Sequence, residues 1–159
     1  MKQFGGIIQL DFTNNRKAFI TGGAQGFGLG TAKELLNIGA HVTIADISEE
    51  AIDKALKDIN SDSVDTCIVD VRNKDSVTTA INESAEKMGG LDTLINSAGV
   101  FEFNKLEDIS EEEWDWIMDV NAKGTFLAMQ AAAPYIKESN NGRVVNLSSD
   151  GGKKGFAMI

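Results

Sequence analysis

Hydrophobic and polar positions along the chain follow two alternating patterns. Short continuous apolar runs, typical of strands buried on both faces of a parallel sheet, lie at residues 17–21, 41–45, 66–69, 91–95 and 143–147. Between them, apolar residues recur at every third or fourth position, which predicts helices over residues 27–38, 47–59, 73–88 and 111–139. This alternation predicts an α/β fold with a doubly wound parallel sheet of five strands.

Glycine, proline and capping residues predict where the helices end or bend. Gly39 and Gly89 follow helical stretches, where a residue of left-handed conformation commonly ends a helix. Ser110 and Glu113 have the spacing of a capping box, which predicts a helix start. Gly124 predicts a bend in the last helix, and Pro134 further along predicts another.

The composition is that of one globular domain in a reducing compartment. The 159 residues predict a single domain, with residues 1–16 as a loosely held leader. The net charge of −9 is unsuited to a nucleic-acid or anionic membrane partner. Cys67 and His41 are the only residues of their types, so we expect no disulfide and no metal site. Because the sequence has no apolar span or signal core, we expect a cytoplasmic protein.

The segment KAFITGGAQGFG at residues 17–28 joins a strand directly to a helix. Its glycines Gly22, Gly26 and Gly28 permit positive φ angles and close approach of a ligand to the backbone. The helix N-terminus that follows offers N–H donors and partial positive charge, which suit a pyrophosphate. A tight turn that only connects the two elements is the alternative, since the spacing differs from the plain G-x-G-x-x-G pattern.

An acidic residue, Asp46, ends the second predicted strand. It lies 18 positions after Gly28, close to the spacing of about 20 at which dinucleotide folds place a ribose-binding carboxylate. A carboxylate there accepts hydrogen bonds from ribose hydroxyls and repels a 2′-phosphate, which favours NAD over NADP. The alternative role is a helix N-cap, although Ser48 can also cap that helix.

Small and polar residues follow the fourth predicted strand. The segment Asn96-Ser97-Ala98-Gly99 allows a flat ligand to lie close to the backbone, and the Asn96 amide can tie neighbouring strands together. Phe101 and Phe103, in an irregular segment, are either substrate contacts or the core of a small lobe. Asn121 stands in an apolar helical stripe, where it is either a satisfied core amide or a catalytic group.

Five motifs in order resemble those of the short-chain dehydrogenase/reductase family, from about residue 15 to the end of the chain. They are T-G-x-x-x-G-x-G at 21–28, D-V at 70–71, N-S-A-G at 96–99 in place of N-N-A-G, the asparagine of VNAKG at 120–124, and GRVVNLSS at 142–149. The resemblance implies a Rossmann-like fold, NAD as the cofactor, and hydride transfer between nicotinamide and an alcohol or ketone.

The resemblance also implies roles for the residues at matching positions. Asn121 would belong to the family's proton relay, and Ser149 would hold the substrate oxygen. Gln25 stands where NADP-dependent relatives often carry Arg or Lys, which again favours NAD. The residues implied to bind the cofactor are Gly22, Gln25, Gly26, Phe27, Gly28, Asp46, Ile47, Asp70, Val71, Asn96, Ala98 and Gly99.

The chain departs from the family pattern in its acid/base. The family uses the tyrosine of a Y-x-x-x-K motif shortly after the serine, and the 159 residues contain no such motif. Tyr135, the only tyrosine, lies in the preceding helix, and Lys153-Lys154 has no tyrosine four positions before it. We therefore expect a C-terminally incomplete domain without the family's last strands. Its fifth strand would lie near an edge, and the face of Phe126, Leu127 and Met129 would be uncovered.

Two functions are compatible with this sequence. One is an NAD-dependent oxidoreductase of the short-chain dehydrogenase/reductase type, which acts on a small-molecule alcohol or ketone, is inactive without a Tyr/Lys segment, and is a homo-oligomer in its complete form. The other is a non-catalytic dinucleotide-binding half-domain or assembly partner. A methyltransferase also pairs a glycine loop with an acidic residue after the second strand, but the Asn96 segment and GRVVNLSS argue against it.

Overall fold

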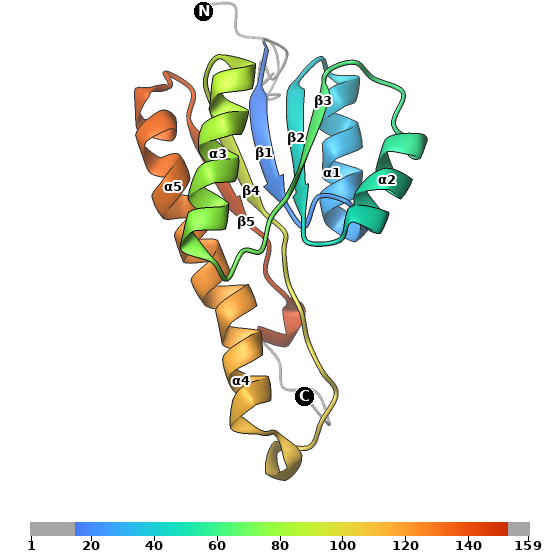
Figure 1. Cartoon of the computed structure of the whole chain (residues 1–159), viewed down its shortest axis with the longest axis vertical. Coiled ribbons are helices and arrows are strands. Elements are labelled where there is room, and N and C mark those ends of the chain that lie inside the picture. Colours follow the sequence, from blue (N-terminus) through green and yellow to red (C-terminus); the bar gives the residue numbers. More distant parts are fainter. Residues whose placement is uncertain (1–14, 153–159) are drawn as a thin grey trace, which may run out of the picture.

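Five parallel strands form one sheet in the part of the chain that the computed structural model describes, residues 15–152 (Figure 1). The strands are β1 (Lys17–Thr21), β2 (His41–Asp46), β3 (Val64–Ile68), β4 (Thr93–Asn96) and β5 (Arg143–Asn146). Their order is β3-β2-β1-β4-β5, and each neighbouring pair is parallel. The predicted doubly wound, Rossmann-like sheet is therefore confirmed.

Helices cover both faces of this sheet, as Figure 1 shows. On one face lie α1 (Gly26–Asn37) and α2 (Glu49–Asp58), and on the other lie α3 (Lys74–Met88) and α5 (Thr125–Glu138). The remaining helical elements are η1 (Leu106–Asp108), α4 (Glu111–Met118), the π-helical turn η2 (Asp119–Gly124) and η3 (Asp150–Gly152).

Strand β1 contributes to the core on both faces because successive strand residues point in opposite directions. Phe19 packs in the cluster under α3 and α5 together with Leu94. Ile20 packs in the cluster under α1 and α2 together with Ile44. All four side chains are fully buried. A central strand that is buried on both faces is apolar at every position, which explains the continuous runs in the sequence.

The predicted helix ends are confirmed in part. Gly39 and Gly89 follow their helices with φ angles of +85° and +67°, in the left-handed region. The Ser110 hydroxyl accepts a hydrogen bond from the Glu113 N–H at 3.1 Å, as a capping box requires. The Glu113 carboxylate, however, accepts two contacts of 2.9 Å from the Asn104 amide, so it ties α4 to the preceding loop.

The helix predicted over residues 111–139 forms as three consecutive helical segments, α4, η2 and α5, and η2 ends at Gly124, where a bend was predicted. The π-helical turn η2 separates α4 from α5, whereas Pro134 lies inside α5 without ending it. The turn passes close to the loop after β3: a Cβ added to Gly124 would lie 2.8 Å from a methyl carbon of Val71. Glycine is therefore needed where the helix crosses this loop.

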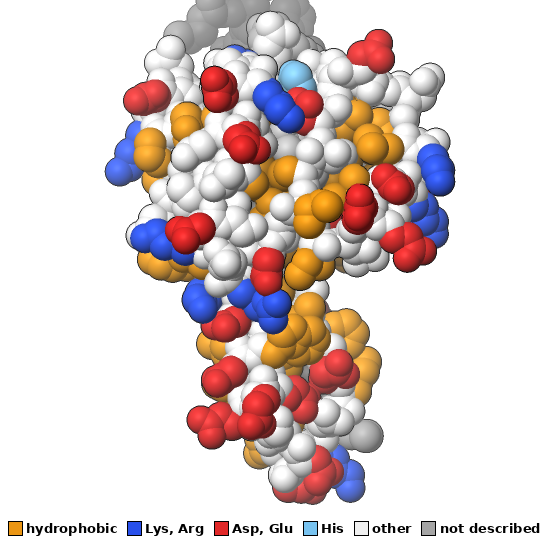
Figure 2. Space-filling view, in the orientation of Figure 1, with side chains coloured by type: hydrophobic (Ala, Val, Ile, Leu, Met, Phe, Trp, Pro, Cys, Tyr) orange, Lys and Arg blue, Asp and Glu red, His pale blue; other side chains and the backbone are white. Residues whose placement is uncertain are grey.

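Residues 97–118 form an arm that extends beyond the carboxyl ends of the strands (Figure 1). The chain runs outward from β4, turns at η1 and returns as α4. Figure 2 shows a narrow waist between the arm and the body, with acidic side chains gathered on the arm. These 22 positions contain seven acidic residues and one lysine.

Phe101 and Phe103 pack edge to face, with ring centroids 4.9 Å apart, but both are exposed, so they do not form the core of a lobe.

The expectation of an uncovered face is only partly correct. Strand β5 lies at the edge of the sheet and all four of its residues are exposed, as predicted. Phe126 is also exposed, but Leu127 is 7% exposed and belongs to the core under α3 and α5. Met129 is half-buried and packs against the same core. The reason is that α5 packs directly on α3, so Leu127 and Met129 point toward the sheet and Phe126 away from it.

A partly buried ion pair joins three strands at the opposite, amino-terminal end of the sheet. The Arg16 guanidinium lies 3.4 Å from an Asp92 oxygen and donates to the Asn141 carbonyl at 2.6 Å. Asp92 also accepts from the Lys17 N–H at 3.1 Å and from the Thr93 hydroxyl at 2.6 Å. These contacts hold together the residues that lead into β1, β4 and β5.

We predict that Asp92→Asn lowers the free energy of unfolding by about 1–3 kcal/mol, because one carboxylate oxygen is replaced by an NH₂ group that faces partly buried donors. Urea unfolding followed by circular dichroism measures the change. Asp58→Asn is the control, since Asp58 is exposed and lies 3.9 Å from Lys33; it should change stability by less than about 0.5 kcal/mol. Equal effects of the two substitutions would contradict the prediction.

Candidate functional site

The glycine loop after β1 lies directly against the segment after β4. Gly22 and Gly26 have φ angles of +61° and +53°. A Cβ on Gly22 would lie 2.7 Å from the Cα of Ala98, and a Cβ on Gly28 would lie 2.2 Å from the Gly22 carbonyl oxygen. Real Cβ atoms do not approach backbone atoms so closely, so these positions require glycine. The predicted residues Gly22, Gly28 and Ala98 are therefore brought together at one place.

Thr21 fixes this contact through hydrogen bonds. Its carbonyl accepts from the Ser97 N–H at 3.1 Å, and its hydroxyl accepts from the N–H groups of Ser97 and Ala98, both at 3.3 Å. Thr21 begins the T-G-x-x-x-G-x-G motif, but its role as a positioning residue was not predicted. The polar position at the end of an otherwise apolar strand was the signal that could have found it.

The N-terminus of α1 differs from those of the other α-helices that begin after a loop, α2, α3 and α4. Ser48, Asn73 and Ser110 each cap their helices with a side-chain oxygen, and each of these helices has acidic residues in its first turn. Gln25 makes no such bond within residues 15–152, and the first turn of α1, which contains Gly26, Phe27 and Gly28, has no acidic residue. The first turn of α1 therefore keeps N–H donors and positive potential for an anion.

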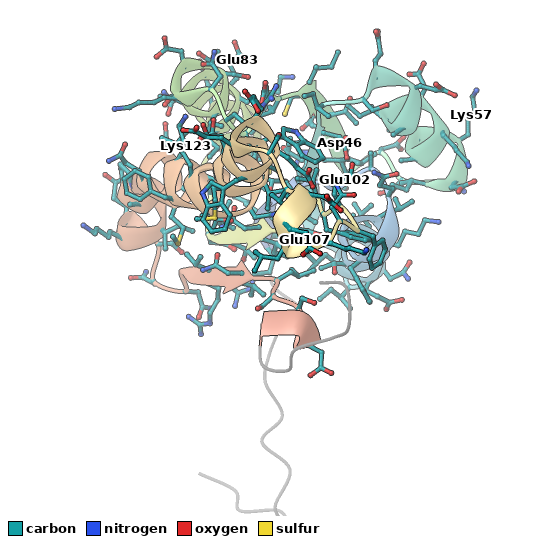
Figure 3. The ribbon with its side chains drawn as sticks, turned by 90° about the horizontal axis from the view of Figure 1, so that it is seen from below. Asp46, Lys57, Glu83, Glu102, Glu107 and Lys123 are labelled. Atoms are coloured by element: carbon teal, nitrogen blue, oxygen red, sulfur yellow. The ribbon has the colours of Figure 1, made fainter. Side chains whose placement is uncertain are left out.

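Asp46 lies at the end of β2, against the glycine loop. Its side chain is buried; one oxygen accepts from the Ala24 N–H at 3.3 Å and the other from the Ser48 N–H at 3.2 Å. Ser48, not Asp46, caps α2, by accepting from the Ala51 N–H at 3.2 Å, so the alternative role for Asp46 is wrong. In Figure 3, which looks from below, Asp46 lies toward the centre and Lys57 at the rim. Ile47, the next residue, is exposed.

Asp70, after β3, is held by Arg72. The Arg72 Nη2 donates to one carboxylate oxygen at 2.7 Å, and Nε donates to the other at 2.9 Å. Hydrogen bonds from the Arg72 side chain hold the pKa of Asp70 below its ordinary value. Val71 packs against Gly124 of η2, so the end of β3 contacts the base of the arm. The pairing of Arg72 with Asp70 was not predicted from the sequence.

Asn121 lies on η2 and clamps the start of the arm. Its Oδ1 accepts from the Val100 N–H at 2.9 Å, and its Nδ2 donates to the Val100 carbonyl at 2.7 Å. Its own carbonyl accepts from the Thr125 hydroxyl at 2.9 Å. A Cβ on Gly99 would lie 3.1 Å from Asn121 Oδ1, so the segment after β4 fits closely against this amide. Asn121 is thus a satisfied amide that positions residues 99–100. It lies on a π-helical turn, and turns of this kind are frequent at functional sites.

Ser149 lies just beyond β5 and is exposed. Its hydroxyl accepts from the Gly151 N–H at 3.1 Å, and within the described part of the chain no hydrogen bond joins it to Asn121. Asn96 does tie β4 to β5 as predicted, because its Nδ2 donates to Asn146 Oδ1 at 2.8 Å. The Asn96 Oδ1 is buried and has no hydrogen-bond partner among the described residues.

Other reactive residue types lie outside this arrangement. Burial raises the pKa of the Cys67 thiol to about 11, so it is not a thiolate at neutral pH. His41 pairs with Asp65 at 2.8 Å at the start of β2, consistent with a structural role. Residues 15–152 contain no group of three or more side chains arranged to hold a metal ion. No helix in this range is long and apolar enough to cross a membrane.

The site as a whole is a backbone cradle at the carboxyl ends of parallel strands. Glycines at close-contact positions, an uncapped helix end and a buried carboxylate after the second strand lie on either side of the point where the strand order reverses, between β1 and β4. This combination fits the phosphates and ribose of a dinucleotide and defines a dinucleotide-binding α/β protein.

Comparison with known proteins identifies the family. A family model described as short chain dehydrogenase matches residues 16–159. The chain is 37% identical over 144 residues to the uncharacterized oxidoreductase Mb1385 of Mycobacterium bovis, covering 90% of this chain and 58% of that protein. It is 34% identical over 154 residues to galactitol 2-dehydrogenase of Agrobacterium fabrum, with coverages of 92% and 57%. The crystal structure of gox2181 is similar with a TM-score of 0.84 at 34% identity, and the match covers 89% of this chain and 56% of that one.

The chain therefore belongs to the short-chain dehydrogenase family, whose members here are oxidoreductases. Family and fold together indicate a nicotinamide nucleotide cofactor, NAD or NADP. The chain spans 57–58% of the length of these two curated relatives.

We predict opposite effects for alanine at two glycines of this region. Gly22→Ala should lower the free energy of unfolding by about 1–3 kcal/mol or more. The reason is that φ is positive at Gly22 and the added Cβ would meet the Ala98 backbone. Gly30→Ala should stabilise it by about 0.5–1 kcal/mol, because Gly30 lies inside α1 and its Cβ would meet nothing within 4 Å. Thermal unfolding measures both changes, and a neutral Gly22→Ala would contradict the close contact described above.

Proposed function

We propose that these residues bind NAD and form the cofactor half of an oxidoreductase that transfers hydride between nicotinamide and a small-molecule alcohol or ketone. The observation that carries the proposal is the uncapped first turn of α1 beside glycines that cannot accept a Cβ. A dinucleotide pyrophosphate would accept hydrogen bonds from the N–H groups of residues 26–28. A bound nicotinamide would supply the hydride chemistry, and the protein would supply binding and orientation.

The preference for NAD over NADP rests on Asp46. Its buried carboxylate is aligned by the Ala24 and Ser48 N–H groups. An oxygen fixed there can accept from ribose hydroxyls, whereas a 2′-phosphate would place a second negative charge beside it. Gln25 adds no positive charge to offset that repulsion. Of the other proposed cofactor contacts, Asn96, Ala98 and Gly99 lie on the floor of the cradle, and Val71 lies at its β3 side.

Fewer of these 159 residues are proposed to contact the substrate than to contact the cofactor. We propose that the Ser149 hydroxyl orients the substrate oxygen and that Asn121, by clamping Val100, positions the segment that leads to Phe101 and Phe103 as substrate contacts. None of these residues is proposed as the acid/base. Tyr135, the only tyrosine, lies ten residues into α5, about 15 Å from the helix start at the site, and donates to Asn82 at 2.9 Å.

Because Tyr135 lies away from the cradle, a non-catalytic dinucleotide-binding domain remains the second candidate function. For the oxidoreductase, the proton donor or acceptor for hydride transfer would come from residues other than these 159, whereas a non-catalytic domain would need none. We further propose that the protein is cytoplasmic and that its complete form is a homo-oligomer, without nucleic-acid or membrane partners.

We predict that the purified chain binds NADH more tightly than NADPH, and that Asp46→Ala weakens NADH binding about tenfold or more while affecting NADPH less. Nicotinamide fluorescence titration gives both dissociation constants. Asp53→Ala, at an exposed position of α2, is the matched control and should leave both unchanged. If the ratio of the NADH and NADPH dissociation constants is unchanged in Asp46→Ala, the assignment of NAD is contradicted.

We also predict that the 159-residue chain shows no turnover of NAD with a panel of secondary alcohols, because general acid/base catalysis worth about 10²- to 10⁴-fold is missing. The formation of NADH is followed by its absorbance. Tyr135→Phe should leave NADH binding unchanged, since its hydroxyl contacts Asn82 and not the cradle. Turnover that disappears in Tyr135→Phe would show that this tyrosine is the acid/base after all.

A further inference from the structure

Strand β5 is an open edge of the sheet. Within residues 15–152 it pairs only with β4, and all four of its residues, Arg143–Asn146, are exposed. Val144 and Val145 are 44% and 47% exposed, and Leu147, just beyond the strand, is 39% exposed. A strand edge with apolar side chains and no covering element is a surface on which another strand can pair.

The contacts with β4 determine which backbone groups of β5 face outward. The N–H groups of Arg143 and Leu147 donate to backbone carbonyls in and next to β4, at 2.8 and 2.9 Å. Successive residues of a strand direct their N–H and C=O groups to opposite sides, so Val145 also faces β4. The N–H and C=O groups of Val144 and Asn146 therefore point away from the sheet, where no described strand meets them.

The distribution of charge favours contact between two copies of the chain at this edge. With a net charge of −9, two copies repel each other in most orientations. Residues 139–149, which contain β5 and its flanks, have Arg143 as their only charged residue. Residues 60–68, which contain the other edge strand β3, carry two aspartates and no Lys or Arg. Two acidic molecules therefore meet with less repulsion along β5 than along β3.

We propose that β5 is a docking edge for a second copy of this chain, in an antiparallel pair about a two-fold axis at Val145. A pair of identical edges related by such an axis is antiparallel and self-complementary. Val145 of one copy lies opposite Val145 of the other, and each Val144 lies opposite Asn146 of the other copy. In this register both outward-facing residues of β5 find partners within β5, and each Val144–Asn146 pair exchanges both of its hydrogen bonds.

The same register avoids a contact between like charges. Arg143, the charged residue of the edge, lies opposite the apolar Leu147 of the other copy and not opposite a second arginine. The inference goes beyond the proposed function and does not rest on it, because the pairing needs no nucleotide.

Disulfide cross-linking tests the register. Val145→Cys places two thiols opposite each other in a pair whose Cα atoms are about 4.5 Å apart, within the range of a disulfide. With oxidised glutathione, this variant should form a covalent dimer on a non-reducing gel. Leu147→Cys is the matched control: its thiols would be about 13 Å apart along the strands, so it should stay monomeric. Burial raises the pKa of the native Cys67 thiol to about 11, which keeps it unreactive.

Sedimentation equilibrium of the nucleotide-free chain tests the association itself. The wild-type chain should show a reversible monomer–dimer equilibrium. Val145→Lys should weaken it about tenfold or more, because two like charges replace an apolar contact at the axis. Ile68→Lys, at a 58% exposed position of β3, is the matched control and should leave the dissociation constant unchanged. Val144→Pro should also weaken the dimer but keep the native circular dichroism, because the N–H that it removes points outward.

Three results would overturn the inference. The first is a folded wild-type chain that stays monomeric at every concentration, which would leave the edge to a different occupant. The second is cross-linking of Leu147→Cys as fast as that of Val145→Cys, which would exclude the proposed register. The third is an equal effect of Ile68→Lys and Val145→Lys, which would place the contact elsewhere. Because no nucleotide is present, failure of the proposed NAD binding would leave these results unchanged.

Discussion

The close approach of the β1 turn to the segment after β4 is the constraint on which the rest of the site depends. The strand order puts β1 between β2 and β4, so its carboxyl end faces both neighbours. Thr21 then holds the N–H groups of Ser97 and Ala98, and the missing side chain of Gly22 leaves room for their backbone. A bulkier turn would push these two segments apart and open the sheet where the cofactor is proposed to lie.

At the same carboxyl ends of the strands, a second set of contacts holds the backbone near the arm. Asn121 binds both polar groups of Val100, while Gly124 lets η2 pass close to Val71. The arm is therefore anchored to the segments that follow β3 and β4. This geometry gives the proposed substrate contacts a rigid base, although the side chains at the far end of the arm are exposed.

The sequence predicted the fold well because buried strands leave a strong pattern. Residues such as Phe19 and Ile20 must both be apolar when helices cover both faces of the sheet, and the runs follow directly. A bend at Gly124 was predicted, but its form as a π-helical turn over Asp119–Gly124 was not, since one widened turn leaves the apolar periodicity almost unchanged. The pairing of Arg72 with Asp70 was equally invisible, because it depends on the orientation of two side chains at the end of a strand.

The backbone positions of the candidate site were easier to predict than its polar contacts. Gly22 and Gly28 are fixed by sterics that any sequence with this turn must obey. The capping-box spacing of Ser110 and Glu113, in contrast, predicted the helix start but not the partner of the Glu113 carboxylate, which is the Asn104 amide of the preceding loop.

The uncapped end of α1 also has a consequence for local stability. A side-chain cap typically contributes about 1 kcal/mol, and α1 forgoes it where α2, α3 and α4 do not. The first turn of α1 is therefore a place where the helix opens more readily than its interior. An anion at this turn would close it, so the amide protons of residues 26–28 would report occupancy through slower exchange with solvent, even in the absence of any turnover.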